Sequence, residues 1–134
     1  MNRESLQMWL DKYVEAWRTY EQAQIEDLFS EDALYFYSPF DEQNPLRGRE
    51  AIVADWLKEP NPAGSWEAHY VPVAVEGNVG VAQGRTRYFK NNGDVEREFD
   101  NIFVLHFDDR GRCTRLPSGL CSRAAHRLHR ADET

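Results

Sequence analysis

Few side chains in this sequence could do acid–base chemistry, and His69 is the most useful of them. An unperturbed imidazole titrates near neutral pH, which suits a general acid or base. Tyr13 carries a hydroxyl that could donate a hydrogen bond to a developing oxyanion. Each has a structural alternative: a hydrogen-bonded histidine at a sheet edge, and a core tyrosine whose hydroxyl bonds the backbone.

A second group of side chains could contact a ligand. Asn101 sits between two phenylalanines on an apolar face, so its buried amide needs a ligand, a water or a neighbouring side chain as partner. Thr86 and Ser38 could add hydroxyl contacts. The candidate pocket walls are aromatic, and plain core packing is the alternative for each: Trp17, Phe36, Trp56 and Phe103.

Bulk properties narrow the class of protein. The chain has 134 residues, 41% of them hydrophobic, which suffices for one domain with a single core. The net charge of −7 argues against nucleic acid as a partner. No apolar run is long enough to span a bilayer, so we expect a cytoplasmic protein without membrane contact. Cys113 and Cys121 lack metal or redox spacing, and we expect neither metal nor cofactor.

Hydrophobic spacing predicts the elements that would position these side chains. Apolar residues at helical intervals predict a helix over residues 4–20, a short second helix near 25–29 and a third after Gly48. A strand is expected at 33–37. Three more strands are expected at about 65–76, 79–90 and 95–107, joined by tight turns. Helices followed by a β-meander indicate an α+β fold.

The turns also predict how the strands pair. A two-residue Asn92-Gly93 turn places Arg87 opposite Glu98, Arg85 opposite Asp100, Gly84 opposite Asn101 and Ala82 opposite Phe103. Opposite charges then meet on one face, and small residues meet large ones on the other. A two-residue Gly77-Asn78 turn extends this register, so that Val73 faces Ala82, Val71 faces Gly84 and His69 faces Thr86.

This register assigns the two faces of the sheet. The inner face carries His69, Asn101, Phe103, Val71 and Val73, and the strand glycines are expected to leave room there for a cavity. The outer face carries the charge pairs and an apolar half that includes Ile102 and Val104. That half needs cover, most simply a second subunit packed sheet to sheet.

The order of elements resembles the nuclear transport factor 2-like superfamily, including its polyketide-cyclase-like (SnoaL-like) members. Four phrases carry the resemblance: "YVEAW", "LFSEDALYFYSPF", "LRGREAIVADWL" and "FDNIFVLHFDDRGRC". The resemblance implies a cone, in which a curved, mostly antiparallel sheet wraps around two to three helices and leaves a deep pocket.

The pattern is also similar to ketosteroid isomerase, a member of that superfamily. Its oxyanion tyrosine falls on Tyr13, but its proton-moving aspartate falls on Ser38 and its second aspartate on Phe103. Since only one of three residues is kept, the resemblance argues against steroid isomerisation by that mechanism.

The C-terminal segment departs from the family pattern. Members usually end with a long strand, often carrying Phe-x-Glu-Trp, where this chain reads Leu116-Pro117-Ser118-Gly119. We therefore predict a truncated final strand, a domain over residues 1–115 and an atypical basic tail over 116–134. A shift of the reading frame could restore Glu-Trp at positions 118 and 119. A divergent tail, with a short helix over 124–129, is the alternative.

Two kinds of function remain open. The first is a pocket protein of the SnoaL-like type that binds an apolar small molecule; as an enzyme it would be a cofactor-independent lyase, isomerase, cyclase or hydrolase. His69 would then move a proton while Tyr13 and Asn101 polarise an oxygenated substrate. The second is a non-catalytic dimerisation module, because one fold hosts many functions.

Overall fold

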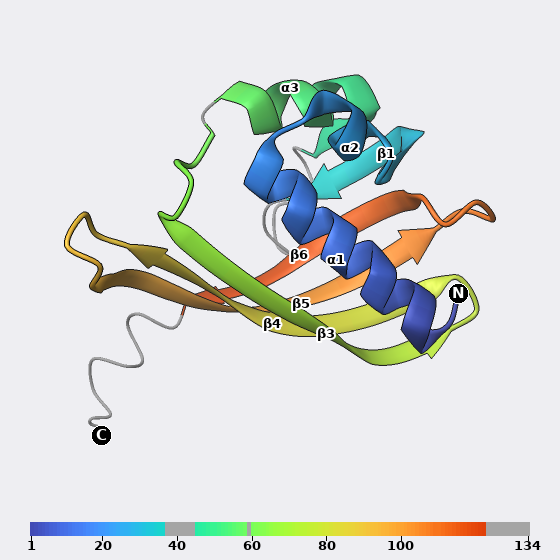
Figure 1. The fold of residues 1–134 in the computed structure, drawn as a ribbon. Helices are drawn as coiled ribbons and strands as arrows, with labels where there is room; N and C mark the ends of the chain where they lie inside the picture. The colour runs from blue at the N-terminus through green and yellow to red at the C-terminus, as the bar shows by residue number, and fades with distance from the viewer. Residues whose placement is uncertain (37–44, 59, 123–134) are drawn as a thin grey trace.

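The computed structural model describes residues 1–36, 45–58 and 60–122, with the backbone alone described for 117–122. The elements in chain order are α1 (Arg3–Thr19), α2 (Gln22–Glu26), β1 (Phe29–Phe36), β2 (Leu46–Arg47), α3 (Arg49–Lys58), β3 (Trp66–Glu76), β4 (Val79–Phe89), β5 (Val95–Phe107) and β6 (Cys113–Ser122). They form one curved, unclosed sheet in the order β2-β1-β6-β5-β4-β3, with α1 lying across one of its faces (Figure 1). The predicted α+β cone is confirmed.

Helix α1 forms because its apolar residues recur at helical spacing and its first turn is capped. The Asn2 side chain accepts a hydrogen bond from the Ser5 backbone N–H, which satisfies a donor that the helix start would leave open. Leu6, Leu10 and Ala16 are then fully buried against the sheet. Burying each large apolar side chain contributes about 1.5–3 kcal/mol, so this stripe holds α1 in place.

The β4–β5 pairing confirms the predicted register over most of its length. Arg87 lies opposite Glu98, Arg85 opposite Asp100 and Ala82 opposite Phe103. The turn itself is longer than predicted, because the Lys90 N–H bonds the Asp94 carbonyl and Phe89 pairs with Val95. A one-residue irregularity between Tyr88 and Phe89 then restores the register. The two deviations cancel, which is why the simple count still placed the distant pairs correctly.

The β3–β4 pairing departs from prediction at a β-bulge. The predicted register holds for Ala74 opposite Val81, but Pro72 rather than Val73 lies opposite Ala82, so Val73 is an extra residue. Because side chains alternate along a strand, one extra residue turns the rest of β3 over. Val71 and Val73 therefore do not join the inner face, and Val73 is 45% exposed.

The strand glycines do not create the cavity that was predicted from them. A side chain at Gly84 would lie 2.1 Å from the His69 carbonyl oxygen and 2.3 Å from the Tyr70 ring. A side chain at Gly80 would meet the Leu6 side chain at 2.9 Å. These glycines instead allow close approach of a neighbouring strand and of α1.

Strand β6 does not stop at Pro117 as predicted. Its backbone continues to Ser122 and pairs with β5, for example Ser118 with Phe103. Leu116 and Pro117, between Arg115 and Ser118, have no paired residue on β5. Pro117 has no N–H to donate, which is consistent with this gap. The helix expected over 124–129 lies outside the described residues. Among the helices that are described, none is long and apolar enough to cross a membrane.

Replacing Gly84 with alanine should destabilise the fold by about 3 kcal/mol or more, because the new methyl group collides with backbone atoms that cannot move aside. Gly80→Ala is the matched control, since the atoms nearest to its methyl group belong to the Leu6 side chain and not to the backbone. Urea unfolding of both variants measures the difference. Equal losses in the two variants would contradict the predicted close approach of β3 at Gly84.

Candidate functional site

A cavity of about 620 Å³ opens between α1, α3 and the inner face of the sheet. Its walls come from side chains that face one another from α1, α3 and strands β1, β3, β4 and β5. The lining residues are Tyr13, Trp17, Tyr20, Tyr35, Asp55, Trp56, Lys58, Asn61, Tyr70, Thr86, Tyr88, Arg97, Phe99, Asn101 and Phe103. The wall is thus mainly aromatic, with a small number of polar groups, as is usual for sites that bind small molecules.

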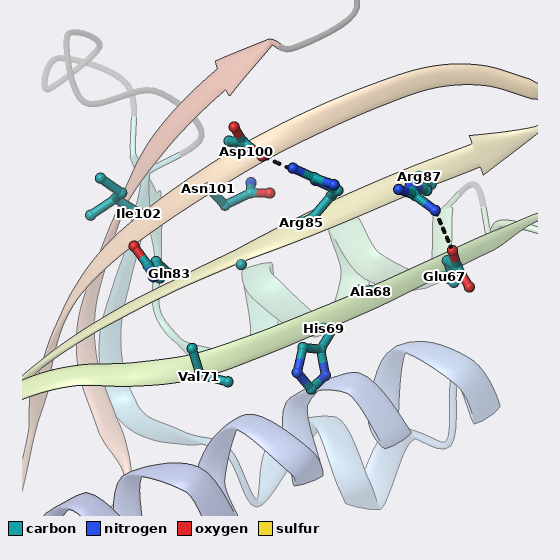
Figure 2. Close-up of a pocket in the computed structure, with 11 residues that line it drawn as sticks. Glu67, Ala68, His69, Val71, Gln83, Arg85, Arg87, Asp100, Asn101 and Ile102 are labelled. Carbon is teal, nitrogen blue, oxygen red and sulfur yellow. Dashed lines mark hydrogen bonds and ion pairs between the residues drawn. The ribbon is translucent and has the colours of Figure 1, made fainter.

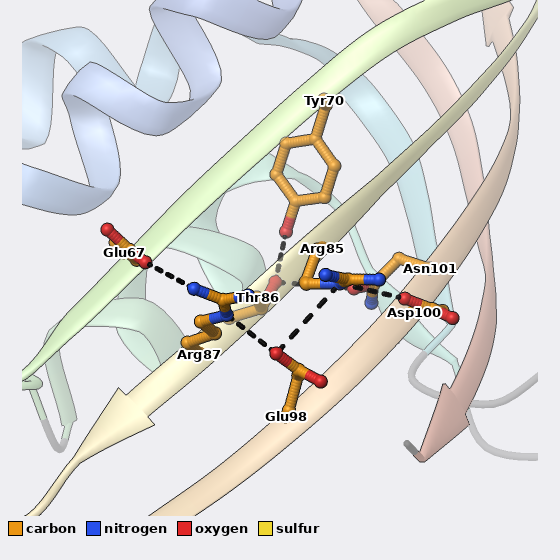
Figure 3. Close-up of polar contacts among 8 residues, drawn as sticks. All are labelled: Glu67, Tyr70, Arg85, Thr86, Arg87, Glu98, Asp100 and Asn101. Atoms are coloured by element: carbon orange, nitrogen blue, oxygen red, sulfur yellow. Dashed lines mark hydrogen bonds and ion pairs between the residues drawn. The ribbon is translucent and has the colours of Figure 1, made fainter. Parts of the chain in front are cut away.

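A chain of hydrogen bonds crosses the inner wall from β3 to β5 (Figure 3). Thr86 donates its hydroxyl proton to Asn101 Oδ1 at 3.2 Å. Since that proton is committed, the Thr86 oxygen accepts from the Tyr70 hydroxyl at 2.7 Å. The direction of the chain leaves the Asn101 amide nitrogen as its donor end. Thr86 and Asn101 are 3% and 6% exposed, so this chain is part of the wall and not a surface feature.

A second pair of polar groups in the cavity wall consists of two tyrosine hydroxyls. The hydroxyls of Tyr13 and Tyr35 are 3.0 Å apart and buried. Burial raises the pKa of Tyr13 well above its usual value, and the neighbouring Tyr35 raises it further. Burial also raises the pKa of Tyr70, which outweighs the opposing effect of its bond to Thr86. Both phenols therefore stay neutral at physiological pH and act as hydrogen-bonding groups.

The structure gathers most of the predicted ligand-binding residues around this cavity. Tyr13, Trp17, Trp56, Thr86, Asn101 and Phe103 all line it. Phe36 does not, because strand alternation directs Tyr35 toward the cavity and leaves Phe36 beneath the Arg115 guanidinium, 4.6 Å from the ring centroid. Ser38 lies outside the described residues.

His69 is the main correction to the predicted site. It lies opposite Arg85, not Thr86, and it is exposed on the outer face of the sheet. The bulge at Val73 is the reason, because it exchanges the faces of His69 and Tyr70. His69 therefore cannot act as a general base in the inner cavity.

The outer face carries its own open hollow of about 670 Å³, shown in Figure 2 with His69, Arg85 and Asp100 among its lining residues. Its two arginines are ion-paired: Arg87 Nε lies 2.6 Å from Glu98 Oε2, and Arg85 Nε lies 3.3 Å from Asp100 Oδ1. These are the charge ladders that the register predicted. Because both arginines of this hollow are already paired with carboxylates, we place the candidate site in the inner cavity.

Sequence reasoning missed several wall residues, and the signals differ. Tyr70 was missed because the bulge at Val73 turns it to the inner face, and no local sequence pattern predicts that bulge. Arg97 could have been found, because it lies on the same face of β5 as Phe99 and Asn101 in the register that was predicted correctly. In the described part of the chain, no group of three or more His, Cys, Asp or Glu side chains could hold a metal ion.

Comparison with known proteins identifies the family. Residues 10–116 match the model of the SnoaL-like domain, and the chain therefore belongs to the SnoaL-like family. Its fold is similar to the crystal structure of an NTF-2 like protein of unknown function from Burkholderia xenovorans LB400. The two share 17% sequence identity with a TM-score of 0.65, over 90% of this chain and 85% of that chain. A search of curated proteins found no match.

The buried tyrosines predict a loss of stability in alkali. Tyr13 and Tyr70 have raised pKa values in the folded state, so above about pH 10 the unfolded chain releases protons that the folded chain keeps. The free energy of unfolding should then fall as pH rises. Each such tyrosine contributes up to about 1.4 kcal/mol per pH unit.

Urea unfolding of the wild type and of Tyr70→Phe between pH 9 and 11 measures this effect. The variant should lose less stability per pH unit than the wild type. The slope separates the titration from the constant cost of removing the hydroxyl from Thr86. Identical slopes in the two proteins would show that Tyr70 ionises as readily in the folded state as in the unfolded one.

Proposed function

We propose that the inner cavity binds an apolar, oxygenated small molecule. The observation that carries this proposal is the buried Tyr70–Thr86–Asn101 chain set into an aromatic wall. Aromatic side chains offer an apolar ligand large, rigid surfaces, and the hydroxyl and amide groups offer it directional hydrogen bonds. Membership of the SnoaL-like family supports a ligand-binding cone.

The proposal is for binding, and proton transfer by His69 is not part of it. Among the described cavity residues, the charged groups are Asp55, Lys58 and Arg97, and the tyrosine hydroxyls of the deep wall are neutral donors. Tyr13 and Asn101 keep the polarising role expected of them, now as contacts that orient a bound molecule. Trp17, Trp56 and Phe103 would pack against its apolar body.

Calorimetric titration with naphthol, a planar apolar alcohol, tests the proposal. We expect saturable binding with an affinity in the micromolar range, on the order of −8 kcal/mol. Trp56→Ala should weaken binding about tenfold, because it removes an aromatic wall. Leu57→Ala is the matched control on the same helix, since Leu57 is partly exposed and does not line the cavity. Equal losses of naphthol affinity in the two variants would contradict the proposal.

We also propose that two copies of the chain pair through the outer sheet face. The outer apolar patch, which we define as Val71, Val81, Ile102 and Val104, lies on strands β3 to β5. Ile102 and Val104 are 53% and 38% exposed, which is unusual for adjacent large apolar side chains on one face. A self-complementary contact across a two-fold axis would cover them.

Ile102→Lys should convert a dimer to a monomer, because it places a charge within the outer apolar patch. Light scattering coupled to size-exclusion chromatography measures the mass directly. Val95→Lys is the control: Val95 is similarly exposed, at 47%, but lies beside the Asn92-Gly93 turn. A wild-type chain that elutes as a monomer would exclude this pairing.

A further inference from the structure

We propose that Arg97 forms an anion-binding subsite at one end of the inner cavity, so that the bound molecule carries an anionic group as well as a hydrogen-bond acceptor for Asn101. This inference rests on the proposed binding function and names the class of ligand. The ligand would be an apolar body with a carbonyl at one end and an acidic group at the other.

The first argument is the environment of Arg97. Its guanidinium carbon lies 4.8 Å from the centroid of the Tyr88 ring and 5.8 Å from that of Phe99. Stacking on aromatic rings holds a guanidinium by its face and leaves its N–H edges available. Arg97 is exposed where it lines the cavity, and within the described residues no carboxylate or other acceptor pairs with it. Arg85 and Arg87, on the neighbouring strand, are both ion-paired.

The second argument is the open donor on Asn101. Its Oδ1 accepts from Thr86, while its amide nitrogen has no hydrogen-bond partner in the part of the chain that the structure describes. The side chain is 6% exposed and lines both the inner cavity and the outer hollow, and its bond to Thr86 places it in the inner wall. The amide nitrogen is therefore a donor with no partner among the described residues, and an acceptor on a molecule bound in the cavity would pair with it. A carbonyl oxygen on the ligand is such an acceptor.

The third argument is spacing. Arg97, Phe99 and Asn101 lie on one face of β5, and four residues of strand span roughly 13 Å between the outer two. The Arg97 side chain leans over Phe99, which shortens the gap between the guanidinium and the Asn101 amide. A ligand whose carbonyl and anionic groups are on the order of 10 Å apart would reach both while its body covers Phe99.

The other charges of the cavity favour a single negative group. Lys58 adds a second cation, and Asp55 adds one carboxylate that has contacts of its own and is not paired with Arg97. Together the three residues carry a formal charge of +1, although the whole chain carries −7. The cavity is therefore locally suited to a monoanion.

Three probes separate the two contacts. The first is acetylnaphthoate, with its ketone and carboxylate at opposite ends of the ring system. Acetylnaphthalene keeps only the ketone. Ethylnaphthoate, the naphthoate anion with an ethyl group on the ring in place of the acetyl group, keeps only the carboxylate. In calorimetric titration of the wild type, acetylnaphthoate should bind about tenfold more tightly than either of the others. Added salt should weaken the binding of the two carboxylate probes and leave the affinity for acetylnaphthalene unchanged.

Variants assign each contact to its residue. Arg97→Gln should weaken acetylnaphthoate about tenfold and leave acetylnaphthalene unchanged. Lys90→Gln makes the same change in net charge at an exposed residue outside the cavity, and it should leave all three affinities unchanged. Asn101→Leu should weaken the binding of the two ketone probes and leave the affinity for ethylnaphthoate unchanged. Circular dichroism and thermal melting confirm that each variant is folded.

The outcomes distinguish this inference from the function it rests on. Binding of acetylnaphthalene as tightly as acetylnaphthoate, with no effect of Arg97→Gln, would refute the anion subsite while leaving the apolar cavity function intact. No saturable binding by naphthol or by any of the three probes would refute both. Equal losses in Arg97→Gln and Lys90→Gln would show that only the overall charge of the protein matters.

Discussion

The β-bulge at Val73 is the constraint on which the arrangement of the cavity depends. The Arg3 guanidinium donates to the Pro72 and Val73 carbonyls at 2.8 and 3.1 Å, and Gln7 Nε2 donates to the Tyr70 carbonyl at 3.3 Å. Helix α1 thereby holds the backbone of β3 where the extra residue is inserted. The bulge directs Tyr70 inward, where its ring lies close to Gly84 and its hydroxyl reaches Thr86. Without the extra residue, His69 would take that place.

Helix α1 links the stability of the fold to the shape of the cavity. Its buried stripe anchors it to the sheet, and the same helix places Tyr13 in the cavity wall. The Tyr13 ring stacks on Trp9 at 5.3 Å and meets Trp56 edge-on at 5.4 Å. Trp9 is fixed in turn by a hydrogen bond from its indole N–H to the Leu28 carbonyl at 3.1 Å. A packed aromatic cluster of this kind gives a binding wall little freedom to rearrange.

The two faces of the sheet differ in the polar groups that they carry, since the outer face has ion pairs and the deep inner wall has neutral hydrogen-bonding groups. On the outer face, Glu98 is buried between two arginines, 2.6 Å from Arg87 Nε and 4.0 Å from Arg85 Nε. The deep inner wall instead uses neutral hydroxyl and amide groups, which an aromatic environment accommodates at lower cost. Arg97 lines the same cavity as an exposed residue, and its guanidinium lies over the Tyr88 and Phe99 rings, whereas Arg85 and Arg87 are paired with carboxylates. That contrast is the physical basis for assigning it to a ligand.

The sequence alone determined the family, the order of the main helices and strands, the β4–β5 register and six of the fifteen residues that line the cavity. Helical spacing and opposite charges on facing strands are local signals, and they place Tyr13, Trp56, Thr86, Asn101 and Phe103 correctly. The Asn92-Gly93 turn is longer than predicted, and the irregularity beside it compensates for the difference. Tertiary structure decided the face of β3, the extension of β6 past Pro117 and the use of the strand glycines. A bulge depends on contacts with a distant helix, here with Arg3, and a glycine can serve a cavity or a close approach equally well. Neither outcome can be read from neighbouring residues, because the atoms that settle it are brought together only by folding.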